Sequence, residues 1–150
     1  MMSQKVSLLV VDDHDAWRRG IRSLLGEFFE ITEACDPREA RNILCKRRFD
    51  CALLDVRMGE QNVSGFDLAK TCGEVNPFMA VIVMSAVITG HSKYDHGSVS
   101  GIIEKNVDPD ALREIIQDAV WRKRMNFKVR TRRLEVFGDL LGLSAGCADY

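Results

Sequence analysis

A chain of 150 residues is the usual size of one domain, and an apolar share of 46% is enough to bury a core without disulfide or metal staples. The net charge of −1 excludes a strong overall field directed at nucleic acid or membrane. Charge is uneven along the chain, because residues 1–121 carry 14 basic and 19 acidic residues, whereas residues 122–150 carry 7 and 3. This asymmetry predicts a separate role for the basic tail.

Short apolar runs alternate with amphipathic stretches along the chain. The apolar runs predict strands at 6–11, 30–35, 51–56, 78–86 and 101–105. Apolar residues at helical spacing predict helices at 16–28, 36–47, 65–74 and 108–123. Asp36 and Asp108 each precede a proline and are predicted helix N-caps. This alternation predicts an α/β fold with a doubly wound, five-stranded parallel sheet and helices on both faces.

The segment between Ala86 and Gly101 interrupts the pattern. Its sequence, VITGHSKYDHGSVS, holds two glycines and three serines and has almost no apolar periodicity. It supports at most a short or mobile helix. His91, Asp95 and His96 within it are predicted to be solvated loop residues rather than a metal site.

Cysteine use and hydropathy indicate the compartment. Five cysteines, none in a C-x-x-C pair, predict small buried side chains in a reducing environment rather than disulfides or a metal site. No apolar run approaches the ~20 residues needed to span a bilayer, and the N-terminal MMSQK lacks the shape of a signal peptide. We therefore expect a cytoplasmic protein with no membrane contact.

Reactive side chains stand where the predicted strands end. Asp12 and Asp13 end the first strand, Asp55 the third, Ser85 the fourth and Lys105 the fifth. In an open parallel sheet these ends line one crevice. Adjacent carboxylates repel each other, and Mg²⁺, which prefers carboxylate oxygens, would offset that repulsion. One carboxylate left partly free can attack a phosphoryl group whose oxygens the lysine and the hydroxyl bind.

These residues together resemble the conserved set of response-regulator receiver domains of two-component signalling. The opening VVDDH…RRGIRSLL is particularly similar to receivers of LuxR/FixJ-type regulators. The resemblance covers about residues 5–122 and implies a flavodoxin-like sheet of order 2-1-3-4-5. It implies Asp55 as phospho-acceptor, Ser85 as switch hydroxyl, Lys105 as the family's invariant lysine, and Mg²⁺ held by Asp12, Asp13, Asp55 and the backbone carbonyl of Arg57.

The implied function is to accept a phosphoryl group from a histidine kinase or phosphotransfer protein and relay it as a conformational signal. Such a domain is not an enzyme in the usual sense, since it catalyses only its own phosphorylation and dephosphorylation. Two alternatives stay open. An atypical receiver would signal by phosphorylation-independent protein–protein binding. An aspartyl phosphatase of the haloacid-dehalogenase type would turn over small phosphate esters, although the adjacent Asp12 and Asp13 break its D-x-D spacing.

Three departures from the family pattern concern how the signal leaves the domain. Gly59 stands where proline is usual and Gly65 arrives about two residues late, which predicts a longer, looser loop beside the acceptor. Ile102 occupies the aromatic switch position, and Asn106 replaces the proline after the lysine. Because an aliphatic residue has no ring to swing, we expect an order–disorder change of residues 88–100 to carry the signal.

We assign residues 1–124 to the receiver and residues 125–150 to a basic tail, a truncated or degenerate output region. The basic stretch 122–133 is predicted to be a solvated extension of the last helix, with nucleic-acid contact or an approach to an output domain as alternatives. TRRLEVFGDLLGLSAG faintly resembles the first helix of a LuxR-type helix-turn-helix, but too few residues follow for a recognition helix. DNA binding is therefore not expected of this chain.

Single residues in and before the tail carry further predictions. An apolar face of the tail is expected to dock on the receiver or on a second subunit in a homodimer. Its residues are Leu134, Phe137, Leu140 and Leu141. Trp121 is predicted to anchor the end of the last helix in the core, and His14 to be an exposed rim residue rather than a ligand.

Overall fold

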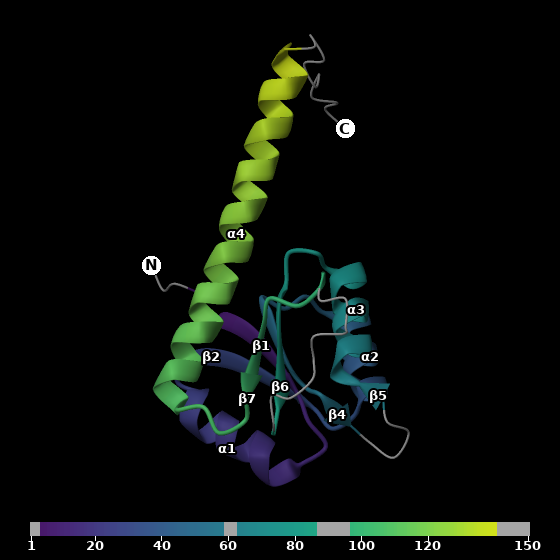
Figure 1. Cartoon of the computed structure of the whole chain (residues 1–150), viewed down its shortest axis with the longest axis vertical. Helices are drawn as coiled ribbons and strands as arrows, with labels where there is room; N and C mark the ends of the chain where they lie inside the picture. Colours follow the sequence, from purple (N-terminus) through teal and green to yellow (C-terminus); the bar gives the residue numbers. More distant parts are fainter. Residues whose placement is uncertain (1–3, 59–62, 87–96, 141–150) are drawn as a thin grey trace.

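The computed structural model describes residues 4–58, 63–86 and 97–140 (Figure 1). Five parallel strands form one sheet in the order β2-β1-β3-β6-β7. These strands are β1 (Val6–Val11), β2 (Phe29–Ala34), β3 (Cys51–Asp55), β6 (Ala80–Ser85) and β7 (Gly101–Glu104). Counted in chain order within the sheet, they have the predicted order 2-1-3-4-5, and the predicted fold class is confirmed.

Two layers of helices cover the sheet. The helices are α1 (Asp15–Leu25), α2 (Pro37–Lys46), α3 (Gly65–Val75) and α4 (Pro109–Leu140). Helices α1 and α4 lie on one face, and α2 and α3 lie on the other (Figure 1). The central strands are buried on both faces because alternate side chains serve alternate cores: Leu9 packs toward α2 and α3, whereas Leu8 packs toward α1 and α4.

The predicted caps set the helix starts. Asp36 Oδ1 accepts the amide of Glu39 at 2.7 Å, and Asp108 Oδ2 accepts the amides of Asp110 and Ala111 at 3.1 Å each. Helix α1 ends at Leu25, short of the predicted residue 28. Leu24 in the helix and Phe28 beyond its end are exposed, whereas Ile21 and Leu25 enter the core.

The loop after β3 differs from the sequence expectation. Strands β4 (Arg57–Met58) and β5 (Val63–Ser64) pair antiparallel, and the amide of Gly65 donates to the carbonyl of Val56 at 2.8 Å. The expected looseness does not extend to the two ends of the loop, which the β4–β5 pairing and this hydrogen bond hold in place. Residues 59–62, with Gly59, lie outside the described residues.

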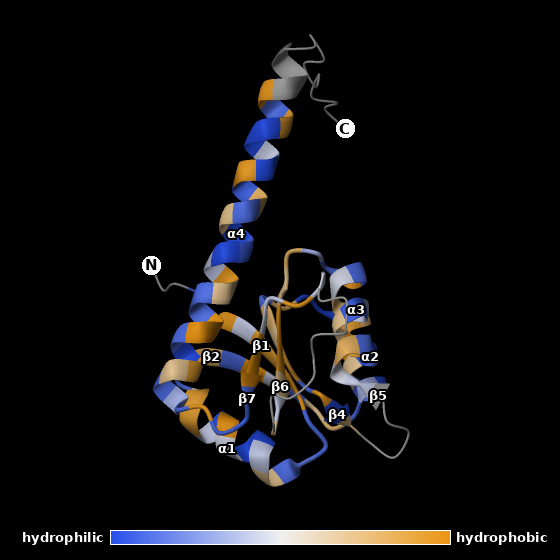
Figure 2. Ribbon diagram, in the orientation of Figure 1, coloured by the Kyte–Doolittle hydropathy of each residue, from blue (hydrophilic) through white to orange (hydrophobic). Residues whose placement is uncertain are grey.

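Helix α4 extends far past the sheet as one continuous helix (Figure 1). Its first part buries Leu112, Ile116, Ala119 and Val120. Beyond them its surface alternates between apolar and strongly polar residues (Figure 2). Although α4 is long, it is too polar to cross a bilayer, and no other helix in the described ranges is long and apolar enough to do so.

Contacts near the middle of α4 attach the helix to the body of the domain, at the start of its extension. Lys123 Nζ donates to the carbonyl of Pro77 at 3.4 Å, Arg124 Nη2 pairs with Asp50 Oδ1 at 3.2 Å, and the rings of Phe127 and Phe78 meet edge to face at 4.4 Å. These contacts grip the amino ends of β3 and β6, the edge opposite the predicted crevice.

Three predictions about α4 and the tail can be compared with the structure. The expectation that Trp121 is a core anchor is wrong, because the residue is 58% exposed and points off the buried face of α4. The basic stretch 122–133 does extend the helix. Leu134 does not dock on the receiver, since it is 73% exposed. The side chains of Phe137 and Leu140, and all of Leu141, lie outside what the structure describes.

The remaining sequence expectations are only partly confirmed. Cys51 and Cys72 are buried, and burial raises the pKa of the Cys72 thiol to about 12. Cys35 and Cys45 are exposed, contrary to the prediction. Residues 87–96, which contain His91, Asp95, His96 and most of the segment expected to change order, lie outside the described residues.

Candidate functional site

The carboxyl edge of the sheet brings together side chains from three of its strands. Asp12 directly follows β1, Asp55 ends β3, and Lys105 directly follows β7. Backbone hydrogen bonds extend past the strand ends and fix these positions: the amide of Asp12 donates to the carbonyl of Ala34 at 3.2 Å, and the amide of Lys105 donates to that of Ser85 at 2.9 Å. The site therefore rests on the hydrogen-bonded ends of the sheet strands.

Lys105 joins two carboxylates that are 43 residues apart in the sequence. Its Nζ lies 2.6 Å from Asp12 Oδ2 and 3.1 Å from Asp55 Oδ2. Asp12 is fully buried, and the side chains of Asp55 and Lys105 are 8% and 19% exposed. An ammonium held by two buried carboxylates is a strong, oriented contact, because removing it would leave buried charge uncompensated.

The pKa values at the site follow from this arrangement. Burial raises the pKa of the Asp55 carboxyl above its ordinary value, and the charge of Asp12 raises it further, against the opposing effect of Lys105. Burial alone would lower the pKa of Lys105, but its hydrogen bond to Asp12 and the charges of both carboxylates outweigh burial and raise it. Lys105 thus stays charged, while negative charge remains in excess.

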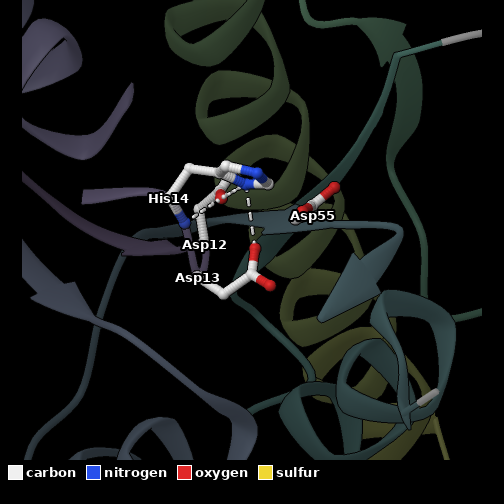
Figure 3. A group of neighbouring side chains, drawn as sticks. All are labelled: Asp12, Asp13, His14 and Asp55. Carbon is white, nitrogen blue, oxygen red and sulfur yellow. Dashed lines mark hydrogen bonds and ion pairs between the residues drawn. The ribbon is translucent and has the colours of Figure 1, made fainter. Parts of the chain in front are cut away.

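Asp13 and His14 complete a cluster with Asp12 and Asp55 (Figure 3). Each of the four residues offers one ligand atom, and these atoms all lie within 4.8 Å of one another. The side chain of Asp13 is 38% exposed, so the cluster opens to water on that side. A group of carboxylate oxygens this close together, beside the ammonium of Lys105, fits a divalent cation such as Mg²⁺.

The positions of the other predicted site residues, Ser85, Arg57 and Ile102, follow from the strands that carry or adjoin them. Ser85 is buried at the end of β6, directly after Met84, which pairs with Asp55 in the sheet. Arg57 is exposed, and its amide lies 3.5 Å from Asp55 Oδ1. Ile102 is half-buried in β7 and packs against the core under α2 and α3.

Two residues of α1 that the sequence analysis did not assign to the site support it. The Trp17 ring lies 5.2 Å from Lys105 Nζ, within reach of a cation–π contact. The Arg18 guanidinium is only 12% exposed; it donates to the carbonyl of Asp12 and pairs with Glu33. The sequence signal that could have assigned them to the site was their position in the first turn of the helix that follows Asp12 and Asp13.

His14 was predicted to be an exposed rim residue, and its side chain is indeed 71% exposed. Its ring nevertheless turns toward the carboxylates, with Nδ1 3.1 Å from Asp12 Oδ1 and 3.0 Å from Asp13 Oδ1.

Comparison with known proteins places this geometry in a family. The model of the response regulator receiver domain matches residues 8–117. The chain belongs to this family. Receivers are the signalling domains of two-component systems rather than classical enzymes, and they bind Mg²⁺ at an acidic pocket that corresponds here to Asp12, Asp13 and Asp55.

Curated relatives agree with the family assignment. The receiver is similar to the alginate biosynthesis transcriptional regulatory protein AlgB of Pseudomonas aeruginosa, with 31% identity over 88% of this chain and 28% of the relative. It is similar to the nitrate/nitrite response regulator protein NarP of Escherichia coli, with 29% identity over 87% of this chain and 64% of the relative. The chain thus spans between about a quarter and two thirds of the length of these relatives.

Solved structures agree with the fold. A CheY-like receiver from Methanospirillum hungatei is similar with a TM-score of 0.75 at 21% identity, over 82% of this chain and 99% of that one. TrrA from Thermotoga maritima, solved in complex with Mg²⁺ and BeF, is similar with a TM-score of 0.69 at 24% identity, over 77% of this chain and 99% of that one.

Proposed function

We propose that this receiver accepts a phosphoryl group on Asp55. For that reaction Asp55 and the backbone carbonyl of Arg57 hold Mg²⁺, and Asp12 and Asp13 bind it directly or through water. The observation that carries the proposal is the position of the Lys105 ammonium, 3.1 Å from the acceptor and 2.6 Å from a fully buried second carboxylate. Lys105, itself held by Asp12, keeps the Asp55 carboxylate in one orientation at the rim of an acidic, partly open site.

In the proposed reaction the chain's own residues position the acceptor and bind the transferred group. A carboxylate oxygen of Asp55 attacks phosphorus, the bond from phosphorus to the donor nitrogen or oxygen breaks, and the donor leaves with the electron pair. Lys105 and the hydroxyl of Ser85 bind phosphoryl oxygens. When bound, Mg²⁺ supplies positive charge that offsets the charge of the phosphoryl oxygens.

The proposal extends to partners and domain organisation. The donor is a histidine kinase or a phosphotransfer protein, which places the reaction in the cytoplasm. Residues 1–124 act as the receiver, and residues 125–150 act as a basic tail whose apolar face contacts a second subunit. Phosphorylation-independent signalling is not favoured, because acceptor, lysine, hydroxyl and acidic pair are all in place at one sheet edge.

Phosphorylation of the intact chain tests the proposal. We expect acetyl phosphate with Mg²⁺ to add one phosphoryl group, measured by intact mass, and EDTA to block the addition. The label should be lost in hydroxylamine, because an acyl phosphate is cleaved by it. A chain that keeps its mass under these conditions is not a phospho-accepting receiver.

Removing Asp13 tests the cation site separately. In the wild type, Mg²⁺ at about 100 times its Kd is expected to raise the free energy of unfolding by about 2.7 kcal/mol by mass action. Asp13→Ala should abolish this gain and slightly raise the melting temperature of the metal-free protein, because it relieves like-charge repulsion. Asp118→Ala, at an exposed position on α4, is the control and should keep the full response. Equal Mg²⁺ responses in all three proteins would contradict the site.

A further inference from the structure

His14 stands at the start of α1, where its carbonyl accepts the amide of Arg18 at 3.2 Å but its side chain does not cap the helix. It is the N-cap residue, with extended backbone angles of φ −87° and ψ 104°, yet its side chain makes no capping hydrogen bond. Its backbone amide donates to Asp12 Oδ1 at 2.8 Å, which ties the residue to the acidic cluster. Since 71% of the side chain is exposed, packing does not hold the ring over the carboxylates.

The carboxylates orient the ring. His14 Nδ1 lies 3.1 Å from Asp12 Oδ1 and 3.0 Å from Asp13 Oδ1, and the ring points toward the cluster in Figure 3. Ligands that share one transition-metal ion at about 2.0–2.2 Å are separated by up to about 4 Å. The four ligand atoms lie within 4.8 Å of one another, so a small rotation of this exposed ring brings its nitrogen into a shared coordination sphere.

Asp12 is the least suited of the four to bind an ion directly. Its Oδ2 lies 2.6 Å from Lys105 Nζ and its Oδ1 accepts the amide of His14 at 2.8 Å. The corresponding contacts of Asp55, with Lys105 Nζ at 3.1 Å and with the amide of Arg57 at 3.5 Å, are longer, so Asp55 is the less tightly held of the two. The remaining ligand atoms come from Asp13, Asp55 and His14. Two carboxylate oxygens and one imidazole nitrogen make a mixed set of ligand atoms. The metal ions that bind best to such a set differ from those that bind best to a set of oxygens alone.

We propose that His14 Nδ1 is a metal ligand and gives this site a stronger preference for transition-metal divalent ions over Mg²⁺ than its carboxylates alone would give. Mg²⁺ takes oxygen ligands and keeps its waters, so an imidazole adds little to its binding. Imidazole binds Mn²⁺, Co²⁺ and Ni²⁺, with affinity rising in that order. This inference rests on the proposed cation site and assigns one more of its ligands.

Calorimetric titration of the full chain with Mg²⁺, Mn²⁺ and Ni²⁺ tests the preference. His14→Asn is the test variant, and asparagine is a favourable N-cap, so α1 should still form. We expect the substitution to weaken Ni²⁺ binding about tenfold or more, to weaken Mn²⁺ binding less, and to leave Mg²⁺ binding unchanged. The control replaces the chain's only other histidines, His91 and His96, with asparagine and should match the wild type.

Electron spin-echo spectroscopy of bound Mn²⁺ gives a readout independent of affinity. We expect modulation from a coordinated imidazole nitrogen in the wild type and in the His91/His96 control, and none in His14→Asn. A wild type without nitrogen modulation, or an equal loss of Mg²⁺ and Ni²⁺ affinity in His14→Asn, overturns the assignment of His14. If Mg²⁺ also fails to bind the wild type, the proposed cation site falls with it; if Mg²⁺ binds and Asp55 is still phosphorylated, only the role of His14 is wrong.

Discussion

Asp55→Asn is expected to abolish phosphorylation by acetyl phosphate while leaving the fold intact. An asparagine side chain has nearly the same shape but offers no carboxylate oxygen to form an acyl phosphate. The fold should tolerate the change because Lys105 keeps its 2.6 Å contact with Asp12, and because the substitution removes a buried charge that Asp12 repels. Intact mass should show no added phosphoryl group, and circular dichroism should match the wild type.

The competing acceptors are the other carboxylates of the cluster. Asp12 is fully buried, whereas the side chain of Asp13 is 38% exposed and reachable by a small phosphodonor. Peptide mapping of the Asp55→Asn protein therefore decides between them. Undiminished labelling, or a label on Asp13, would show that Asp55 is not the acceptor. Asp118→Asn on the outer surface of α4 should label like the wild type.

Gly65→Ala is expected to be the most destabilising single-methyl substitution near the site. A Cβ at Gly65 would lie 2.1 Å from the backbone oxygen of Asp55 and 3.2 Å from Cα of Val56, and neither is the end of a flexible side chain. Relieving this overlap requires α3 to move away from β3, at a cost of about 3 kcal/mol or more. Thermal denaturation should then show a melting temperature lower by roughly 6–12 °C.

A second glycine provides the matched control. Gly20 lies within α1, and a Cβ there would meet nothing within 4 Å. Gly20→Ala should therefore stabilise the protein by about 1 kcal/mol through helix propensity. If Gly65→Ala is as harmless as Gly20→Ala, the close approach of α3 to the acceptor strand is not real. Phosphorylation by acetyl phosphate should also slow in Gly65→Ala, because the carbonyl it displaces belongs to Asp55.

Gly65 also shows what sequence reasoning reached and what it missed. Its late position relative to the family pattern predicted a longer loop. The pairing of β4 with β5, which returns the chain to the acceptor, was not predicted. A two-residue ladder leaves almost no periodic signal. By contrast, the central strands β1, β3 and β6 were predictable because each is a largely apolar run buried on both faces.

The candidate site divides in the same way. Strand ends meet at one edge of a parallel sheet, so the convergence of Asp12, Asp55 and Lys105 followed from topology alone. The roles of Trp17 and His14 depend on which way individual side chains turn, and apolar or polar character does not specify that. Trp121 was misplaced for a related reason: a large aromatic in an amphipathic helix was taken for a buried one, yet it lies just past the last buried residues of α4.

Helix α4 connects the neighbourhood of the candidate site with the exposed basic stretch. It begins four residues after Lys105 and is gripped near its middle, where Arg124 meets Asp50 and Phe127 meets Phe78. The stretches on either side of this grip, 109–124 and 127–140, are each roughly 20 Å long at 1.5 Å per residue. The first of these stretches is packed on the sheet through Leu112, Ile116 and Val120, whereas the second extends past the body. A rigid tilt of α4 at the β7–α4 junction beside Lys105 would therefore displace the extended end of the helix by a distance similar to the displacement at the junction.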